Sequence, residues 1–152
     1  MDLSAITDKL YVASRPRSSD AAELTEHGVR LVMNMIPVRT PLGLRSTPLR
    51  ACWLPWLDSA LLPLPTWLLG RGTRIALLTM ASDEAVLVYC REGRHRSVAM
   101  ACAILIAQGM NAEQAMAHVK RARPIADPSA PHVAAAIRRF EATWHNAQKP
   151  AP

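Results

Sequence analysis

Short apolar runs alternate along this chain with longer segments in which apolar residues recur at helical spacing. The short runs have the length of strands, and polar or turn-forming residues bound each of them. They cover residues 10–13, 31–36, 51–55 and 85–89. The longer segments predict helices over residues 21–27, 66–81, 98–109, 111–123 and 134–144. Strands that alternate with helices predict an α/β fold, here a single layered domain with a central, largely parallel sheet flanked by helices.

Two local signals bear on the helix predictions. Asn111 followed by Gln114 has the pattern of a capping box, which marks the start of a helix. Gly70 and Gly72 lie inside the expected helix 66–81 and weaken that prediction, because glycine is a poor helix former.

Length and composition indicate one domain. The chain has 152 residues, half of them hydrophobic, which is enough to bury a core. We expect this domain over residues 1–147 and a frayed tail over residues 148–152. The chain start lacks the basic and apolar stretches of a secretory signal, and the longest apolar run, Val98 to Ala107, is too short to span a bilayer. The expectation is a soluble, cytoplasmic protein with no membrane span.

The charge balance favours anionic substrates. The formal net charge is +6, and a basic surface attracts anions. Aromatic residues make up only 5% of the chain and do not alternate with the basic residues, so a stacking platform for nucleic acid is unsupported. No nucleic acid is therefore expected as a structural partner.

Cys52, Cys90 and Cys102 have neither a disulfide framework nor metal-ligand spacing, so no metal site is expected. Cys102 lies in an apolar helix and Cys52 in an expected strand, where each suits a small core residue. A regulatory disulfide between either one and Cys90 is an open alternative.

Cys90 ends the apolar run 85–89 and opens a loop of sequence Cys-Arg-Glu-Gly-Arg-His-Arg-Ser. A strand, a tight loop and a helix start in that order form an anion-binding cup, because backbone N–H groups and the helix dipole converge there. Such a position lowers the pKa of a thiol and favours the nucleophilic thiolate. Arg96 adds a planar fork of donors that suits two phosphate oxygens.

This pattern, Cys90 and Arg96-Ser97 with Gly93 between them, resembles the signature loop of cysteine-dependent protein tyrosine phosphatases. The short chain and the flanking segments are most similar to the dual-specificity branch of that superfamily. The similar flanking segments are residues 6–14, 24–34 and 113–124. The resemblance implies a phosphatase-like fold and a hydrolase that acts on phosphorylated protein through a phosphocysteine intermediate, without a cofactor.

Within that chemistry, Cys90 is the nucleophile, and Arg96 with the loop amides stabilises the transferring phosphoryl group. Ser97 follows the arginine, where its hydroxyl can donate to the sulfur or satisfy the first turn of the helix. The substrate- and phosphate-binding residues implied by the resemblance are Arg91, Glu92, Gly93, Arg94, His95 and Arg96. Arg91, Arg94 and His95 either form a solvated rim or bind further anionic groups.

Asp58 is the candidate general acid. It follows an expected strand, where the resembling family keeps the residue that protonates the leaving oxygen and later takes a proton from water. The alternative is a solvated turn aspartate. Glu92 is a weaker candidate for the acid, and Asp83 and Asp127 lack the right placement.

Two further positions are compared with the family pattern. Asn34 resembles an asparagine that ends a strand and braces the cysteine loop. Tyr89 stands where the family usually has a histidine that lowers the thiol pKa, so we expect weaker activation of Cys90.

Several functions compete on these residues. The first is a dual-specificity or tyrosine phosphatase, and the second is a phosphatase for a polyanion such as a phosphoinositide or an RNA 5′ phosphate. A third is a pseudophosphatase that binds phosphorylated ligands without turnover, which would have no need of Asp58. A sulfurtransferase of the rhodanese type also places a cysteine loop after a strand, but Arg96-Ser97 suits phosphate better.

Overall fold

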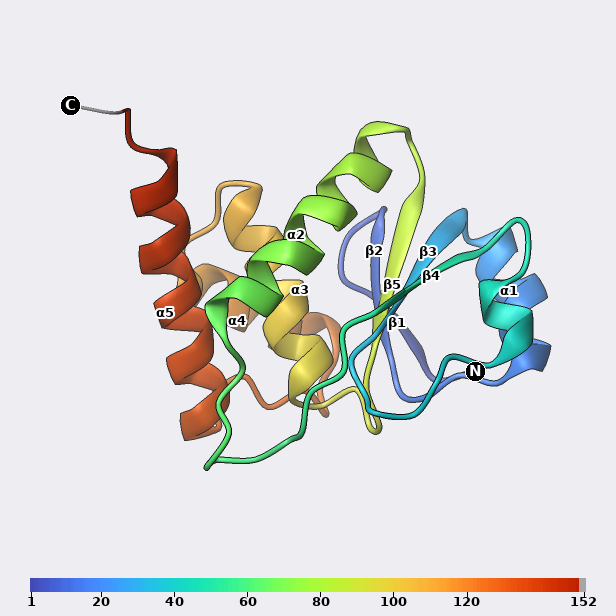
Figure 1. The fold of residues 1–152 in the computed structure, drawn as a ribbon, viewed down its shortest axis with the longest axis horizontal. Helices are drawn as coiled ribbons and strands as arrows, with labels where there is room; N and C mark the ends of the chain where they lie inside the picture. Colours follow the sequence, from blue (N-terminus) through green and yellow to red (C-terminus); the bar gives the residue numbers. More distant parts are fainter. Residues whose placement is uncertain (151–152) are drawn as a thin grey trace.

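A computed structural model describes residues 1–150 of the chain and shows one mixed sheet (Figure 1). The strand order is β1-β2-β5-β3-β4, and only β1 runs antiparallel to its neighbour. The strands are β1 (Leu3–Ala5), β2 (Leu10–Ala13), β3 (Val29–Asn34), β4 (Arg50–Trp53) and β5 (Ala85–Tyr89). The predicted α/β fold with a largely parallel central sheet is confirmed.

Helices cover both faces of the sheet. The short α1 (Ala21–Glu26) lies on one face together with two 3₁₀ turns, Ser18–Asp20 and Leu42–Arg45. On the other face, α2 (Thr66–Ala81) and α3 (Arg96–Ala107) pack on the strands. Two outer helices, α4 (Ala112–Ala122) and α5 (Pro131–Gln148), pack against α3, with α5 at the edge of the molecule (Figure 1).

The structure adds to the predicted elements at both ends of the chain. Strand β1 was not predicted, because three half-exposed residues give no periodic signal and form a strand only by pairing with β2. Helix α5 begins at Pro131, earlier than the predicted 134, and proline at a first helical position is a known start signal. Of the expected tail, Gln148 still belongs to α5, and residues 151–152 lie outside the described residues.

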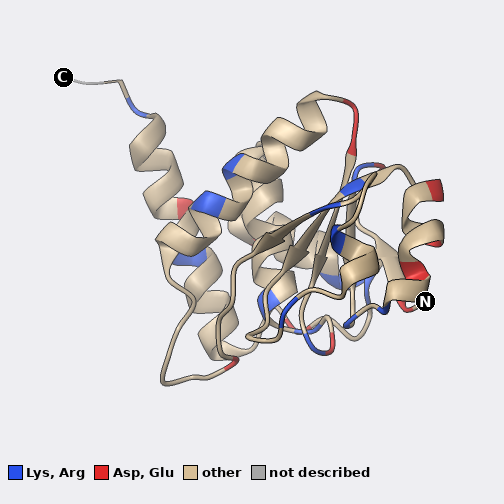
Figure 2. Cartoon of the chain, turned by 45° about the vertical axis from the view of Figure 1, so that its right-hand side comes forward, with Lys and Arg blue, Asp and Glu red and all other residues tan. Residues whose placement is uncertain are grey.

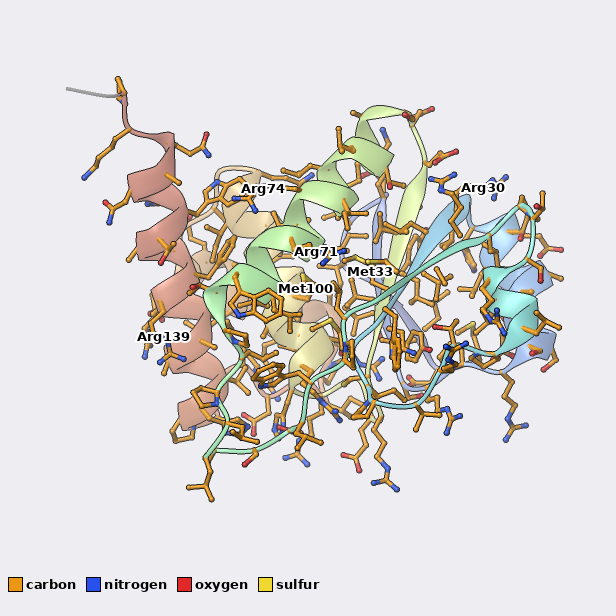
Figure 3. The ribbon with its side chains drawn as sticks, viewed as in Figure 1. Arg30, Met33, Arg71, Arg74, Met100 and Arg139 are labelled. Atoms are coloured by element: carbon orange, nitrogen blue, oxygen red, sulfur yellow. The ribbon has the colours of Figure 1, made fainter. Side chains whose placement is uncertain are left out.

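Both local signals for helices can be compared with the structure. The capping box is confirmed, because Asn111 Oδ1 accepts from Gln114 N at 2.8 Å and Asn111 N donates back to Gln114 Oε1 at 3.0 Å. The predicted helix 66–81 is confirmed as α2, which runs unbroken through Gly70 and Gly72. A Cβ on Gly72 would collide with the side chains of Met100 and Met33, which lie beneath α2 (Figure 3). Glycine is there because the helix approaches the core closely.

The parallel register brings four strand ends to one edge of the sheet. Ala13 of β2 and Asn34 of β3 both align with Tyr89, and Asn34 aligns with Trp53 of β4. The loop that begins at Cys90 is therefore flanked by the segments that follow β2 and β3. Basic residues gather on loops at this edge, the lower one in Figure 2. Ligands of open α/β sheets bind beyond the carboxyl ends of the strands, so the fold favours a site here.

Arg123, just after α4, holds the Cys90 loop from behind. It is 1% exposed, and its Nε and Nη2 donate to the carbonyl oxygens of Gly93 at 2.7 Å and Glu92 at 3.1 Å. Nη2 also donates to Asp2 Oδ2 at 2.6 Å, while Nη1 donates to Asp2 Oδ1 and to Ser4 Oγ. A buried arginine with this many acceptors fixes the loop against β1 and the chain start.

Gly93 is required by the same contact. Its φ of +66° lies in the left-handed region, which favours glycine. A Cβ there would lie 2.5 Å from Arg123 Nη2 and 2.7 Å from the carbonyl carbon of Ala13. The glycine at the centre of the loop thus allows its backbone to lie against β2 and Arg123.

No helix of residues 1–150 is both long and apolar enough to cross a membrane. All three cysteines are free thiols in this structure.

We predict that Asp2→Asn destabilises the protein in a pH-dependent way. The hydrogen bond with Arg123 holds the pKa of Asp2 at about 2, below its usual 3.8, so the charged pair stabilises the fold above pH 4 and loses that contribution as the pH falls toward 2. The expected loss at pH 7 is about 1 kcal/mol, reduced because the carboxylate is half-exposed. Urea unfolding at pH 7 and at stepwise lower pH measures it, with Asp8→Asn as the matched control. A loss of equal size at pH 7 and pH 3 would contradict the prediction.

Candidate active site

Cys90 is a buried thiol in an environment that stabilises its ionised form. It is 2% exposed, and its Sγ lies 3.2 Å from Ser97 Oγ. Burial alone would raise the pKa of Cys90, but hydrogen bonds from the Ser97 hydroxyl and from the backbone of Ser97 and Arg94, with the charge of Arg96, outweigh it and lower that pKa. Burial raises the pKa of both Cys52 and Cys102. Cys90 is thus the one of the three cysteines whose environment favours the thiolate.

Arg96 opens α3 and points its guanidinium into the same region. Its Nη1 donates to the carbonyl oxygen of Trp56 at 2.7 Å, which fixes one arm of the fork. Its Nε is buried and has no hydrogen-bond partner among the described residues. A buried donor without a partner costs free energy, and a phosphate oxygen would satisfy it.

A cleft of about 590 Å³ lies beside Arg96. Its walls come from the segments that follow four parallel strands and from the start of α3. The lining residues are Arg15 after β2, Ile36, Pro37 and Val38 after β3, Leu57 and Asp58 after β4, Arg91 after β5, and Arg96. Three arginines and one carboxylate therefore share the cleft.

Asp58 reaches this cleft from the segment between β4 and α2. One of its oxygens, Oδ2, lies 2.7 Å from His95 Nδ1, and the other, Oδ1, lies 3.0 Å from His132 Nε2 at the start of α5. Partial burial by itself would raise the pKa of Asp58, but the hydrogen bonds with His132 and His95 outweigh it, so the pKa is lowered. The carboxylate is therefore ionised at neutral pH and held in place by two imidazoles.

The comparisons with known proteins agree with this geometry. A sequence model described as the dual specificity phosphatase catalytic domain matches residues 10–141. The chain belongs to this family. The tyrosine-protein phosphatase yvh1 of Schizosaccharomyces pombe is 24% identical over 130 residues, which are 85% of this chain but only 38% of that relative.

Solved structures of dual-specificity phosphatases share the fold. Human DUSP28 superposes with a TM-score of 0.85 at 24% identity, over 96% of this chain and 100% of that one. PTPMT1 in complex with PI(5)P also gives a TM-score of 0.85, at 19% identity, over 98% and 100% of the two chains. The expected resemblance to the dual-specificity branch is confirmed.

Among the loop residues expected to bind phosphate in this dual-specificity phosphatase domain, the structure separates two groups. The side chains of Arg91 and Arg96 line the cleft. Arg94 Nη2 lies 3.8 Å from Asp127 Oδ2, and His95 contacts Asp58, so neither side chain is among those that line it. The remaining two residues do not line the cleft either: Gly93 has no side chain, and Glu92 is exposed on the loop.

Asn34 and Tyr89 stabilise a neighbouring loop. Asn34 is fully buried; its Nδ2 donates to Val38 O at 2.7 Å and to Thr40 Oγ1 at 3.1 Å, and its Oδ1 accepts from Ile36 N. The Tyr89 hydroxyl is 3.5 Å from the same Thr40 oxygen, and burial raises the Tyr89 pKa. The predicted brace on the Cys90 loop is corrected, because the bonds of Asn34 hold residues 36–40, which form a wall of the cleft.

Several contributors to the site were not predicted. His132, in the first turn of α5, and Asp127, in the loop before it, lie far along the chain from the Cys90 loop, and folding brings them beside His95 and Asp58. Arg15 lies in a turn after β2 and carries no local sign of function. The partner of Arg96, Trp56, acts through its backbone carbonyl, which no side-chain pattern reveals.

We predict that Ser97→Ala raises the pKa of the Cys90 thiol. The Ser97 hydroxyl is the leading interaction that opposes burial, so its loss leaves the thiolate less stabilised. The pH dependence of iodoacetamide alkylation measures the shift in a Cys52→Ser background, and Ser82→Ala serves as control. An unchanged alkylation profile would mean that the backbone and Arg96 alone stabilise the thiolate.

Proposed function

We propose that this chain hydrolyses phosphomonoesters through a phosphocysteine intermediate, as a protein tyrosine or dual-specificity phosphatase. The observation that carries the proposal is the pairing of Cys90, the thiol with a lowered pKa, with the buried Nε of Arg96, which has no hydrogen-bond partner within residues 1–150. A nucleophile and a donor for the transferring phosphoryl group then stand at one helix start, where the dipole also favours an anion.

In the first step, the Cys90 thiolate attacks phosphorus while the bond from phosphorus to the leaving oxygen breaks. Arg96 and the amides of residues 91–96 bind the equatorial oxygens, and Asp58 gives its proton to the leaving oxygen. Asp58 must be protonated at that moment. The histidines hold its pKa low in the free protein, and the negative charge of a bound phosphate acts in the opposite direction.

In the second step, water attacks the phosphocysteine, Asp58 takes a proton from that water, and the bond between sulfur and phosphorus breaks. The Ser97 hydroxyl stabilises the departing thiolate at 3.2 Å. Every group is then back in its starting state, so one water is consumed for each phosphomonoester and no cofactor is needed. We place this activity in a single domain over residues 1–147, and the cytoplasmic location stays a prediction.

We predict that Cys90→Ser abolishes turnover and that Asp58→Asn slows hydrolysis of phosphotyrosine on the order of a hundredfold or more. The need for a proton grows with the basicity of the leaving oxygen. Asp58→Asn should therefore slow the hydrolysis of an aryl phosphate with a very acidic phenol much less. Steady-state kinetics on both substrates measure the difference, with Asp83→Asn as the matched control.

Equal losses on the two substrates would give Asp58 a structural role. Unchanged turnover by Cys90→Ser would exclude the phosphocysteine route. A wild-type protein that binds phosphotyrosine peptides but turns none over would be a pseudophosphatase.

A second candidate substrate class is a polyanion, favoured by the two arginines that line the cleft in addition to Arg96. Arg15 and Arg91 are held together, since Arg15 N donates to Arg91 O at 3.2 Å. Their charges flank the place of the scissile phosphate, where a second phosphate or an acidic side chain would sit. PTPMT1, which shares the fold, has been solved with PI(5)P, a ligand of that kind.

We predict that replacing Arg15 and Arg91 by glutamine raises KM for polyanionic phosphomonoesters and leaves KM for small aryl phosphates nearly unchanged. The wild-type advantage should shrink with added salt, because exposed charges are screened. Arg94→Gln is the matched control, since Arg94 pairs with Asp127 outside the cleft. If the double variant and the control have the same KM for a polyanion, the proposal that the enzyme prefers polyanionic substrates is wrong.

A further inference from the structure

Beside the phosphate cleft, three possible metal ligands converge from three separate parts of the chain. They are Asp58 before α2, His95 in the Cys90 loop and His132 in the first turn of α5. One ligand atom from each lies within 4.8 Å of the other two. We propose that this cluster binds a transition-metal ion, Zn²⁺ in the first instance, and that the bound ion inhibits the phosphatase.

The distances are close to those of a metal site. The two oxygens of Asp58 lie 2.7 and 3.0 Å from the imidazole nitrogens. With zinc bonds of about 2.0–2.1 Å in tetrahedral geometry, neighbouring ligand atoms lie about 3.3 Å apart. To bind the metal through one oxygen, the Asp58 carboxylate therefore has to turn toward both nitrogens and these contacts have to lengthen by a few tenths of an ångström, while the proton shared in each hydrogen bond leaves. Asp58 stands in an irregular segment, outside any helix or strand, which permits such a shift.

The rings are already oriented for this geometry. The His95 and His132 centroids lie 5.2 Å apart at an interplanar angle of 80°, so both nitrogens face the carboxylate without stacking of the rings. His95 contacts Asp58 through Nδ1, which leaves Nε2 on the far side of its ring.

A second carboxylate stands behind His95. Asp127 Oδ2 lies 3.6 Å from His95 Nε2, which is buried and has no hydrogen-bond partner among the described residues. Asp127 is itself positioned, because its N donates to Arg94 O at 3.0 Å and its Oδ1 accepts from Ser129 Oγ at 3.1 Å. A metal-bound histidine commonly donates its second N–H to a carboxylate, which fixes the tautomer with the other nitrogen free for the metal.

The ligand types select the metal. Two imidazoles and one carboxylate suit Zn²⁺, whereas Mg²⁺ and Ca²⁺ prefer sites made of oxygen. Three protein ligands leave one position open to water or to a substrate oxygen.

The inhibitory consequence rests on the proposed function, while the binding claim does not. Metal bonds occupy the lone pairs of Asp58, so it cannot carry the proton that the leaving oxygen needs. Inhibition by zinc should therefore be stronger for phosphotyrosine than for an aryl phosphate with a very acidic phenol.

Binding is tested on the Cys90→Ser protein without a polyhistidine tag, so that neither the Cys90 thiolate nor added histidines bind the metal. Zn²⁺ titration by calorimetry and Co²⁺ titration by visible absorption should both show one equivalent bound, with no competition from excess Mg²⁺. His132→Ala should abolish this binding, and Asp127→Asn should weaken it roughly 10–100-fold. His145→Ala, an exposed histidine near the other end of α5, is the matched control and should bind as before.

Zinc affinity that is the same in the His132→Ala and His145→Ala proteins would overturn the site, as would the absence of a bound equivalent. The activity arm compares zinc inhibition of the otherwise unchanged enzyme with that of its His132→Ala variant, each relative to its own rate without metal. Inhibition that disappears in the variant supports the proposal. If one equivalent binds but turnover on both substrates is unaffected, the metal site stands and its inhibitory role is overturned, together with the acid role of Asp58.

Discussion

Backbone N–H groups of Arg94 and Ser97 face the sulfur of Cys90, and a loop of that shape does not hold itself. Arg123 holds it. This buried side chain donates to the carbonyl oxygens of Glu92 and Gly93 on the outer side of the loop. The carbonyl groups are thereby satisfied away from the sulfur, so the opposite side of the loop is free to present N–H groups to Cys90. The lowered thiol pKa thus depends on an arginine that contacts neither the thiol nor the cleft.

The loop also positions the residues that act with it. Arg96 donates to the carbonyl oxygen of Trp56, and its neighbour His95 contacts Asp58. Two adjacent residues at the end of the loop therefore hold two points of the segment before α2, on which the candidate acid stands. Because that segment is otherwise irregular, a shift of the loop would move Asp58 together with Arg96. Cys90, Arg96 and Asp58 are thus coupled through three hydrogen bonds and through the first two residues of α3, Arg96 and Ser97.

Local pattern was enough to predict most of the fold. Residues 10–13 and 85–89 are buried strands because their apolar side chains fill the core, and those two strands were predicted to the residue. The Cys90 loop was predicted because strand, turn and helix follow one another directly in sequence. Strand β1 pairs with the nearby β2 but is too short to give a periodic signal, whereas the contacts of His132 depend on partners far along the chain, so nothing near that residue in sequence reveals them. The reason for glycine at position 72 is not visible locally either, because helix propensity is local and the approach of Met33 and Met100 is not.

The arginines of the Cys90 loop do not form the single basic rim that their closeness in sequence suggests. Arg91, Arg94 and Arg96 lie close in sequence, where they suggest one continuous basic surface. In the folded loop they diverge: Arg91 and the largely buried Arg96 line the cleft, and Arg94 turns to Asp127. The third arginine of the cleft is Arg15, which the parallel pairing of β2 with β5 brings beside Arg91. The two exposed arginines of the cleft, Arg15 and Arg91, are therefore brought together by the order of the strands, while the place of Arg96 follows from the loop itself.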